Sequence, residues 1–407
     1  MMTSSRHVIS PMYSNQKDLL QHPQYDTMIC IMTQTSKLFT FILLFVCSFL
    51  IASYFLFTKY LDSDVKQERE EIIQLKNSEK LLAEMTLEEK VGQMFIMGFW
   101  GTEPDYYITK MIQERNIGGI ILFKYNVQDA KQLTKLSSDL QTLSKKVPLL
   151  ISIDQEGGVV SRLDTNIVSE ITAQSEITKE KDAYNISKKR AKELKALGIV
   201  MNFSPVLDNI QKEDSFLYDR VFRNDISLLG NAMISGYSDG GIVAVPKHFP
   251  GHPDDITDSH KGLPETNISK AKFDEYASQF KEVILNEDTQ AMMVGHILFK
   301  NIDGANPSSL STKIITEILR EKYGFNGVVI TDDMQMSALT ESFSISEAAV
   351  KAVIAGNDIL IYSGEPEQQA QAYNAIISAV KDGTLSEERI NESVLRILTL
   401  KSQIFNL

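Results

Sequence analysis

The chain has 407 residues, of which 43% are hydrophobic and only 11 are proline, so it can bury a large core and is not disordered throughout. Its formal net charge of -12 argues against nucleic acid as a partner, because binding phosphates requires a basic surface. The two cysteines, Cys30 and Cys47, both precede the segments that predict a globular fold. A disulfide, a cysteine nucleophile and a structural zinc finger are therefore excluded there.

The N-terminal part contains one long apolar segment. Residues 1–37 are polar and irregular, so we assign no structure to them and expect a cytoplasmic tail. Leu38–Phe57 carries no charged residue, and a helix of this length reaches about 30 Å, enough to cross a bilayer. It predicts a transmembrane helix or signal anchor. A cleaved signal peptide or a buried core helix is the alternative, but the segment is long for a signal peptide and lacks a small-residue cleavage site.

The charges flanking this segment predict its orientation. Basic residues precede it and acidic residues follow it, which favours an N-terminus inside the cell and the remaining chain outside. These residues are Arg6, Lys17 and Lys37 before the segment and Asp62, Asp64, Glu68, Glu70 and Glu71 after it. Residues 58–84 are charged and lack proline and glycine, so we expect a helical stalk. The prediction is a single-pass protein of the cell membrane with an extracellular domain, or a secreted protein if the segment is cleaved.

Residues 85–407 predict one globular domain, which opens with the capping box of Thr86 and Glu89. From there short apolar runs alternate with amphipathic helical segments. Eight runs are predicted as strands: Met94–Gly98, Gly119–Phe123, Leu149–Asp154, Val200–Ser204, Ile242–Val245, Ala291–Gly295, Gly327–Thr331 and Asp358–Tyr362. The helical segments include Val127–Ser144, Glu180–Leu197, Ile226–Ser238, Ile268–Leu285, Thr312–Lys322, Ile345–Ala355 and Glu367–Lys381.

Eight strands with intervening helices predict an α/β fold of the TIM type, a (β/α)8 barrel. A doubly wound open sheet is the alternative, and it is disfavoured because no glycine-rich dinucleotide-binding turn follows the first strand. Active sites of such barrels lie at the carboxyl ends of the strands, so the polar residues found there belong together. They are Asp154, Asp208, Lys247, His248, His296 and Asp332.

The longest polar loop, Lys247–Pro264, follows the fifth predicted strand and contains histidines and aspartates whose protonation suits acid/base chemistry or metal binding. Five motifs in the chain, taken in order, resemble glycoside hydrolase family 3 and its β-N-acetylhexosaminidase subgroup. The motifs are Met85–Met94, Asp154–Leu163, Asn202–Asp208, Lys247–His252 with Asp258–His260, and Thr331–Met334. The resemblance covers roughly residues 85–400 and leaves out the N-terminal part.

The resemblance implies a retaining hydrolase that removes terminal β-linked N-acetylglucosamine or another N-acetylhexosamine from cell-wall-derived or related glycosides. It implies a covalent intermediate on Asp332 and an acid/base dyad of His260 with Asp258, a dyad similar to that of the hexosaminidase subgroup. Residues implied to bind the sugar are Asp154, Arg162, Arg220, Lys247 and His248, with His296 and Asp208 as further pocket residues. No cofactor and no metal ligand are implied, and the partners are a small-molecule or oligosaccharide substrate and the membrane. The oligomeric state does not follow from the sequence.

The chemistry is coherent without the resemblance. Retaining hydrolysis requires one ionised carboxylate and one group that protonates the leaving oxygen. Asp332 at a strand end supplies the first, and an imidazole such as His260, with an ordinary pKa of about 6.5, suits the second. We expect the loop from Gly251 to His260 to close over bound sugar. Pro253 stands where the family usually has glycine, and it should stiffen the entry to this loop.

Four alternatives remain open at this point. A β-glycosidase of other specificity, or a phosphorylase, is the nearest, because a histidine acid does not repel phosphate as a carboxylate would. A metal-dependent barrel hydrolase would use His248, His252, His260 and His296 with Asp154 or Asp332 as zinc ligands, but the first strand lacks a His-x-His pair. A sugar-binding protein without catalytic activity is disfavoured by the intact Asp332, Asp258 and His260.

Overall fold

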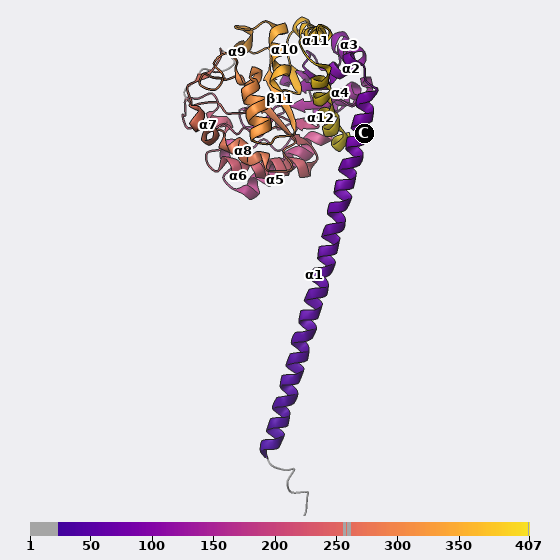
Figure 1. Cartoon of the computed structure of the whole chain (residues 1–407), viewed down its shortest axis with the longest axis vertical. Coiled ribbons are helices and arrows are strands. Elements are labelled where there is room, and N and C mark those ends of the chain that lie inside the picture. The colour runs from indigo at the N-terminus through magenta and orange to yellow at the C-terminus, as the bar shows by residue number, and fades with distance from the viewer. Residues whose placement is uncertain (1–22, 255–257, 259–261, 406) are drawn as a thin grey trace, which may run out of the picture. The chain divides into compact units, whose positions relative to one another are not determined.

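The computed structural model describes residues 23–254, 258, 262–405 and 407 of the chain (Figure 1). The chain divides into two compact units, Met1–Ile72 and Ile73–Leu407. The described part of the first unit is a helix, and the second unit contains the barrel. Each unit is described by itself below.

Helix α1 runs from Pro23 to Ala83 without interruption. Within it, Cys30–Phe55 is long and apolar enough to cross a membrane, and none of this segment is buried inside the protein. Sequence reasoning assigned no structure to residues 1–37, and this was wrong from Pro23 onward. Once a helix has formed, each added residue gains one backbone hydrogen bond, so the helix can extend from the apolar segment into the polar residues before it.

The second unit begins inside α1, so the end of the segment expected as a stalk belongs to it. Ser78 is buried, with its hydroxyl oxygen 3.1 Å from that of Ser402. The side-chain amide of Asn77 donates to the carbonyl of Leu407 at 3.2 Å. The capping box predicted after this segment is present at α2 (Leu87–Gln93), where Thr86 and Glu89 each accept a hydrogen bond from the other's backbone amide.

Eight parallel strands form the barrel, in the order β7-β6-β3-β2-β1-β12-β11-β9. They are β1 (Phe95–Met97), β2 (Gly119–Leu122), β3 (Leu150–Ile153), β6 (Met201–Asn202), β7 (Val243–Ala244), β9 (Ala291–Val294), β11 (Val328–Asp333) and β12 (Ile359–Tyr362). The residues just after β7 close the barrel against β9. The Met293 amide donates to the Pro246 carbonyl at 3.0 Å, and the Phe249 amide donates to the Met293 carbonyl at 2.8 Å. The predicted barrel is confirmed, and each strand overlaps a predicted apolar run, although β11 extends two residues further, through Asp332 and Asp333.

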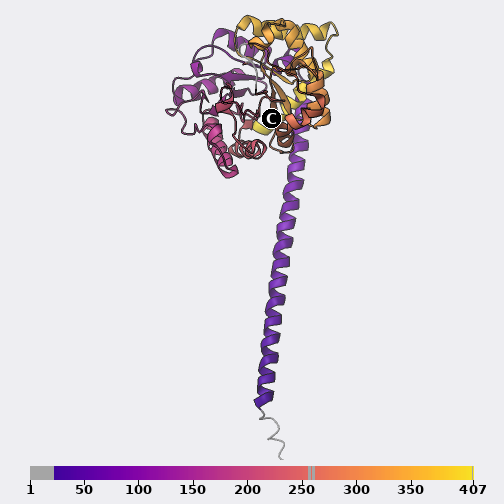
Figure 2. The ribbon, with the colours of Figure 1, turned by 90° about the vertical axis from the view of Figure 1, so that its left-hand side faces the viewer.

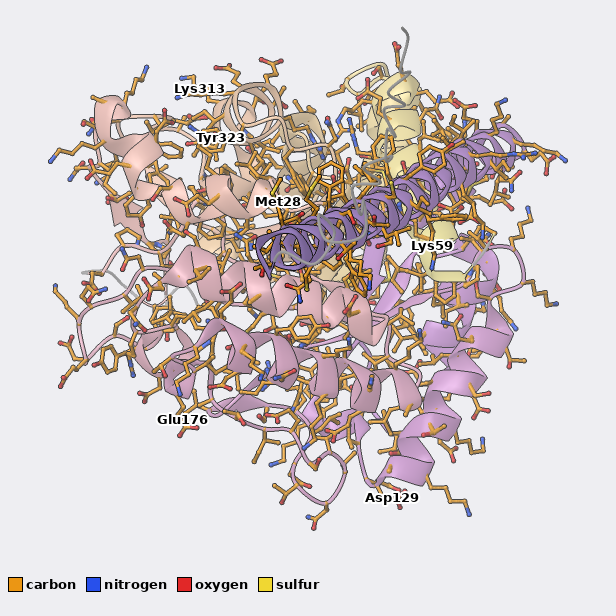
Figure 3. All side chains as sticks on the ribbon, turned by 90° about the horizontal axis from the view of Figure 1, so that it is seen from below. Met28, Lys59, Asp129, Glu176, Lys313 and Tyr323 are labelled. Carbon is orange, nitrogen blue, oxygen red and sulfur yellow. The ribbon has the colours of Figure 1, made fainter. Side chains whose placement is uncertain are left out.

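Helices cover the outside of this barrel, as the two perpendicular views show (Figures 1 and 2). They are α3 (Tyr106–Arg115), α4 (Ala130–Leu143), α5 (Glu180–Ala196), α6 (Ile226–Gly240), α7 (Lys270–Tyr276), α8 (Ser278–Ile284), α10 (Ile345–Ala355), α11 (Pro366–Lys381) and α12 (Glu387–Phe405). The π-helix η5 (Lys313–Lys322) takes the place of the predicted helix Thr312–Lys322. In Figure 3, Lys313 and Tyr323 mark its two ends, and Asp129 marks the N-cap of α4.

The structure departs from the predicted elements in two further ways. The predicted helix Ile268–Leu285 is divided at Ala277, which ends α7 with φ -94° and ψ 15°. Short elements also occur at the carboxyl end of the barrel. They include the antiparallel hairpin β4 (Gln155–Gly157) with β5 (Val160–Ser161), the parallel pair β8 (Glu265–Thr266) with β10 (Leu298–Phe299), and the 3-10 turns η1 (Lys124–Asn126) and η3 (Tyr218–Arg220).

A group of charged residues closes the amino end of the barrel. Asp358 lies just before β12 and is fully buried among three guanidinium groups. Arg320 and Arg396 approach its carboxylate oxygens to 2.5 and 3.1 Å, and a nitrogen of Arg389 lies 3.6 Å away. Although burial alone would raise the pKa of Asp358, these three charges lower it, so the carboxylate is ionised in the fold. We call Asp358, Arg320, Arg389 and Arg396 the base cluster.

Candidate active site

A pocket of about 230 Å³ opens at the carboxyl ends of the strands. Charged groups dominate its wall, with three carboxylates facing three cations. The lining residues are Asp154, Glu156, Val160, Arg162, Phe216, Arg220, Lys247, His248, His252 and Asp332. Six of the residues expected from the sequence therefore meet in one pocket, although they lie as far apart in the chain as Asp154 and Asp332.

Glu156 is the most deeply buried carboxylate of this wall. Arg220 reaches it with two nitrogens, at 2.9 and 2.8 Å, and the Lys247 ammonium lies 2.7 Å away. Although burial alone would raise its pKa, the charges of Lys247 and Arg220 outweigh burial and lower the pKa of Glu156 to about 2. The same ion pair raises the pKa of Arg220 against the effect of burial. All three groups are therefore charged in the folded protein.

Lys247 joins Glu156 to a second carboxylate. Its ammonium group donates to Asp154 at 2.6 Å, and Arg162 lies 3.5 Å from the other oxygen of Asp154. Burial would lower the pKa of Lys247, but the carboxylates of Asp154 and Glu156 raise it. We call Asp154, Glu156, Arg220 and Lys247 the pocket cluster. Its charged side chains use part of their hydrogen-bonding capacity on one another and direct the rest to the pocket.

Asp208 lies behind the pocket wall and does not line the pocket. One of its carboxylate oxygens lies 2.7 Å from Nδ1 of His248, and the other accepts the backbone amide of His252 at 2.6 Å. Both imidazoles line the pocket, and their ring centroids are 5.3 Å apart. Burial lowers the pKa of His252 to about 4, which keeps this ring neutral near neutral pH. The position of Asp208 suits holding His248 and His252 more than contacting a ligand.

Asp332 and Asp333, at the end of β11, differ in their surroundings. Asp332 lines the pocket and accepts the Asp333 amide at 2.8 Å. Burial alone would raise its pKa, but the nearby imidazoles of His248 and His296, the Asp333 amide and the Lys247 ammonium lower the pKa of Asp332 to about 2. Asp333 faces away from the pocket toward the Ser363 hydroxyl and the Gln335 amide. Burial raises the pKa of Asp333 to about 6, so Asp332 is the carboxylate that is firmly ionised.

His296 also lies behind the pocket wall. Its Nδ1 is 2.7 Å from the hydroxyl oxygen of Ser309, and its Nε2 is 3.0 Å from the carbonyl oxygen of Asp333. These contacts connect His296 to the backbone that presents Asp332. Like Asp208, it is placed to support a pocket residue.

Of the expected acid/base dyad, His260 lies outside the described residues. Asp258 is described and is partly buried, but it is not among the residues that line the pocket. The entry to the loop is firmly held. Gly251 has φ 118°, a value that favours glycine, and its carbonyl accepts the Tyr276 hydroxyl at 2.8 Å. Asp254 accepts the amides of residues 211 and 212 at 2.8 and 2.9 Å. Whether the loop closes over sugar remains a prediction.

The described barrel matches a known family along most of its length. The model of the glycosyl hydrolase family 3 N terminal domain matches residues 86–400. The chain belongs to glycosyl hydrolase family 3. The family expected from the sequence motifs is thereby confirmed.

Relatives within family 3 carry related names. The chain is 30% identical over 329 residues to beta-hexosaminidase A of Pseudoalteromonas piscicida, an alignment that covers 73% of this chain and 55% of that protein. It is 31% identical over 283 residues to a beta-hexosaminidase of Methylobacillus flagellatus, covering 66% and 79% of the two chains. The structure of a family 3 beta-N-acetylglucosaminidase from Paenibacillus sp. strain FPU-7 superposes with a TM-score of 0.75 at 37% identity. That superposition covers 78% of this chain and 62% of the other, so the chain spans little more than half the length of some relatives.

Sequence reasoning missed several residues of this family 3 pocket. Glu156, Phe216 and Val160 were not predicted, and His252 was considered only as a metal ligand. A signal for Glu156 was present, because side chains two positions apart on extended backbone point to the same side, as Asp154 and Glu156 do. Phe216 lies in the loop after β6 and gave no comparable signal.

The alternative of a metal site has a geometric test within residues 23–254, 258, 262–405 and 407. Among these residues, no three side chains of His, Cys, Asp or Glu converge closely enough to hold a metal ion. Asp208 instead pairs with His248, and His296 contacts Ser309, so these imidazoles already have other partners. The fourth histidine considered as a ligand, His260, lies outside this part of the chain.

Proposed function

We propose that this family 3 protein is a retaining β-N-acetylhexosaminidase that releases terminal β-linked N-acetylglucosamine. The names of its relatives support this activity for a chain that matches them along its barrel. The composition of the pocket supports a sugar as the ligand. Three carboxylates and three cations form a wall without a large excess of either charge, and such a wall can accept and donate hydrogen bonds to the hydroxyl groups of a neutral ring.

The observation that carries this proposal is the state of Asp332. Its carboxylate has a pKa lowered to about 2 and lies in the pocket at the end of a barrel strand. A nucleophile must be ionised and rigidly placed to attack the anomeric carbon and form a glycosyl-enzyme. Asp332 has both properties. The neighbouring cations keep this carboxylate ionised before the reaction. As its oxygen bonds to the anomeric carbon, the glycosidic bond breaks, and its electron pair leaves on the leaving oxygen, which takes a proton from the acid.

The proposed proton donor is His260, supported by Asp258. Retaining hydrolysis needs a group that first protonates the leaving oxygen and then removes a proton from water. An imidazole can alternate between these roles near neutral pH, and a carboxylate two residues earlier can hold its tautomer. This part of the mechanism rests on the resemblance to the hexosaminidase subgroup.

The proposed binding roles follow the geometry of the pocket. Asp154, Arg162, Lys247, Arg220 and His248 would contact the hydroxyl groups of the sugar. Asp208 and His296 would act as positioning residues, because neither lines the pocket, Asp208 holds the lining residue His248, and His296 holds the backbone carbonyl of Asp333 next to Asp332. We further propose glycosides derived from cell walls as substrates.

The helix α1 suggests where this activity operates. We propose that Cys30–Phe55 anchors the protein in the cell membrane with the barrel on the outer face, supported by the length of the helix and by the acidic residues that follow it. Protease added to intact cells should then degrade the barrel. A barrel protected until the cells are lysed would overturn this orientation.

Kinetics on aryl glycosides test the activity. We expect turnover of nitrophenyl N-acetyl-β-glucosaminide at least 100 times faster, by kcat/KM, than turnover of the corresponding glucoside, and no dependence on phosphate. A rate that requires phosphate and yields sugar 1-phosphate would assign a phosphorylase instead. A slow fluorinated substrate should trap a covalent adduct on the peptide that contains Asp332, and an adduct elsewhere would reject the nucleophile assignment.

A further inference from the structure

Three aromatic side chains form a stack beside the pocket, on the rim formed by the loops after β1 and β2. Tyr125 lies between the others in the order of contacts, with its ring centroid 4.1 Å from that of Trp100 and 5.4 Å from that of Phe123. The interplanar angles are 25° and 13°, so the rings are nearly parallel. Trp100 is 59% exposed, which is unusual for a side chain of this size in a globular domain. We call Trp100, Phe123 and Tyr125 the aromatic platform.

A buried polar residue holds the platform in place. The side chain of Asn126 is fully buried, and it donates to the carbonyls of Phe99 and Gly101 at 3.0 and 2.7 Å. Its oxygen accepts the Phe123 amide at 2.9 Å. Asn126 therefore fastens the backbone on both sides of Trp100 to the turn that carries Tyr125. An exposed indole on a fixed backbone is already arranged for binding, so little conformational entropy is lost when a ligand covers it.

The platform is continuous with the pocket through Arg162. The guanidinium carbon of Arg162 lies 5.3 Å from the ring centroid of Phe123, and the same group reaches Asp154 at 3.5 Å and lines the pocket. Tyr125 is also close enough to Asp333 and Arg162 for their charges to act on its hydroxyl group. The platform therefore follows the rim from the sugar-binding wall toward the strand end that carries Asp332.

The chemistry of the platform differs from that of the pocket. The pocket offers charges to hydroxyl groups, whereas a flat aromatic surface fits the face of a pyranose ring that presents C–H groups. One occupant satisfies both surfaces at once, namely a glycoside with one ring in the pocket and another ring on the platform. A small monosaccharide held in the pocket would leave Trp100 uncovered.

We propose that the aromatic platform, with Trp100 as its outer surface, binds a sugar ring on the leaving-group side of the bond to be cleaved. This inference rests on the proposed function and identifies the substrate as an oligosaccharide or a glycoside with a second ring. The platform contributes to affinity for the leaving group and not to the bond-breaking step.

A fluorescence titration tests the inference without depending on turnover. Trp100 is the single tryptophan of the chain, so intrinsic tryptophan emission reports on the platform alone. In Asp332→Asn, which should bind without turnover, the β-1,4-linked trimer of N-acetylglucosamine should shift or quench this emission. The monomer should compete with the trimer while itself changing the emission little. No change at a trimer concentration that saturates binding by calorimetry would overturn the proposal, as would an equal change with the monomer.

Kinetics provide the second test. In Trp100→Ala, the ratio of kcat/KM for the trimer to kcat/KM for the methyl N-acetyl-β-glucosaminide should fall about tenfold, which corresponds to roughly 1.4 kcal/mol. Trp100→Phe keeps an aromatic face and should recover most of the ratio. Tyr106→Ala is the matched control, because Tyr106 is 75% exposed on α3 and is not part of the platform.

The outcomes separate this inference from the proposed function. A wild-type protein that hydrolyses both substrates, combined with an unchanged ratio in Trp100→Ala, would overturn the platform and leave the hydrolase standing. A wild-type protein that hydrolyses neither substrate would reject the proposed function, and the fluorescence titration would still decide whether the platform binds a sugar ring. An equal loss in Tyr106→Ala would assign the effect to general destabilisation and overturn the inference.

Discussion

The two ends of the barrel each bury a carboxylate among cations, but they use the remaining hydrogen-bonding capacity differently. At the amino end, the base cluster turns inward. Arg320 donates to the carbonyls of Phe325 and Gly327 at 3.2 and 3.1 Å, in addition to its contact with Asp358. Arg389 donates to the carbonyl of Asn357 at 2.9 Å. Arg320 and Arg389 thus bind backbone carbonyls as well as Asp358, although the buried Nε of Arg320 has no hydrogen-bond partner among the described residues.

At the carboxyl end, the pocket cluster remains open on one side. Glu156 is as deeply buried as Asp358, but its cations Arg220 and Lys247 line a cavity. Arg220 and Lys247 can donate hydrogen bonds to a ligand in this cavity without breaking their contacts with Glu156. The comparison indicates that ion pairing alone does not identify a functional site. At the amino end, Arg320 and Arg389 face backbone carbonyls and Arg396 lines a separate cavity of about 280 Å³. At the carboxyl end, both cations paired with Glu156 line the same pocket as three carboxylates.

The largest expected effect is the loss of activity in Asp332→Asn. The amide cannot form the proposed ester with the sugar, so kcat should fall by at least about 1000-fold. Its melting temperature should change less than that of Asp358→Ala, because the pocket can readmit water around the new amide. Stopped assays and thermal denaturation measure both quantities. Activity within tenfold of wild type would remove Asp332 from the mechanism.

A substitution in the base cluster should have the opposite effect: it should lower the stability of the fold and leave the kinetic constants unchanged. Asp358→Ala leaves three guanidinium groups around a vacated position, and breaking a buried ion pair in this way costs about 3–5 kcal/mol. Chemical denaturation should report this loss. At a temperature where the variant is folded, its KM should match that of wild type. A destabilisation below about 1 kcal/mol would show that the ion pairs of the base cluster do not stabilise the fold.

Glu156→Gln should affect both properties, each less than the preceding variants. The amide still accepts hydrogen bonds from Arg220 and Lys247, and Lys247 keeps Asp154. We expect kcat/KM to fall about 10- to 100-fold, in line with the loss of one charge-assisted hydrogen bond. Steady-state kinetics and denaturation check this expectation. An unchanged kcat/KM would place Glu156 with the structural residues, beside Asp358.

The pH dependence of stability offers a finer comparison. The pKa of Glu156 is lowered from an ordinary 4.5 to about 2 in the fold, so the unfolded chain takes up this proton first as the solution is acidified. The stability that ionised Glu156 contributes is complete above about pH 4.5 and is lost as the pH falls toward 2. Glu156→Gln should therefore lose stability less steeply than wild type across this window. If the free energy of unfolding, measured in urea, fell equally with pH in wild type and Glu156→Gln, the lowered pKa of Glu156 would be contradicted.

The smallest expected effect is that of a substitution in an exposed ion pair. Lys110 and Glu114 lie 3.9 Å apart on α3, and 47% and 60% of the two side chains are exposed. Glu114→Gln should change neither the melting temperature nor kcat/KM measurably, because water screens such pairs. A measurable loss here would mean that burial is not what separates the two clusters from other ion pairs.

The sequence predicted the barrel because its strands are buried on all sides. Every residue of β2, β3, β9 and β12 is buried, so each strand appears in the sequence as an uninterrupted apolar run. Helix boundaries were less predictable. The division at Ala277 leaves no proline or glycine as a signal, and the start of α1 at Pro23 depends on the propagation of an apolar helix into polar sequence.

The candidate site was predictable where a residue lies at the end of a strand or within three residues after it. Asp154, Lys247 and Asp332 fall into this group. The spacing of Glu156 from Asp154 was a local signal for its orientation, but its contacts with Arg220 and Lys247, which are distant in the chain, are not encoded by any local pattern. Asp208 and His296 were predicted as pocket residues, but in the folded chain neither lines the cavity: Asp208 contacts His248, and His296 contacts the backbone carbonyl of Asp333.

The closure of the barrel between β7 and β9 limits which residues of this protein can be substituted without disturbing the fold. The peptides that join β7 to β9 flank Lys247 and His248, so the side chains proposed to hold the sugar are part of the seam. A substitution that moved either one would loosen the barrel itself. Evolution of substrate preference is therefore directed toward residues that can change without opening the seam. Trp100 and Tyr125 lie on loops outside the ring of strands, so a substitution at either position would leave this seam intact.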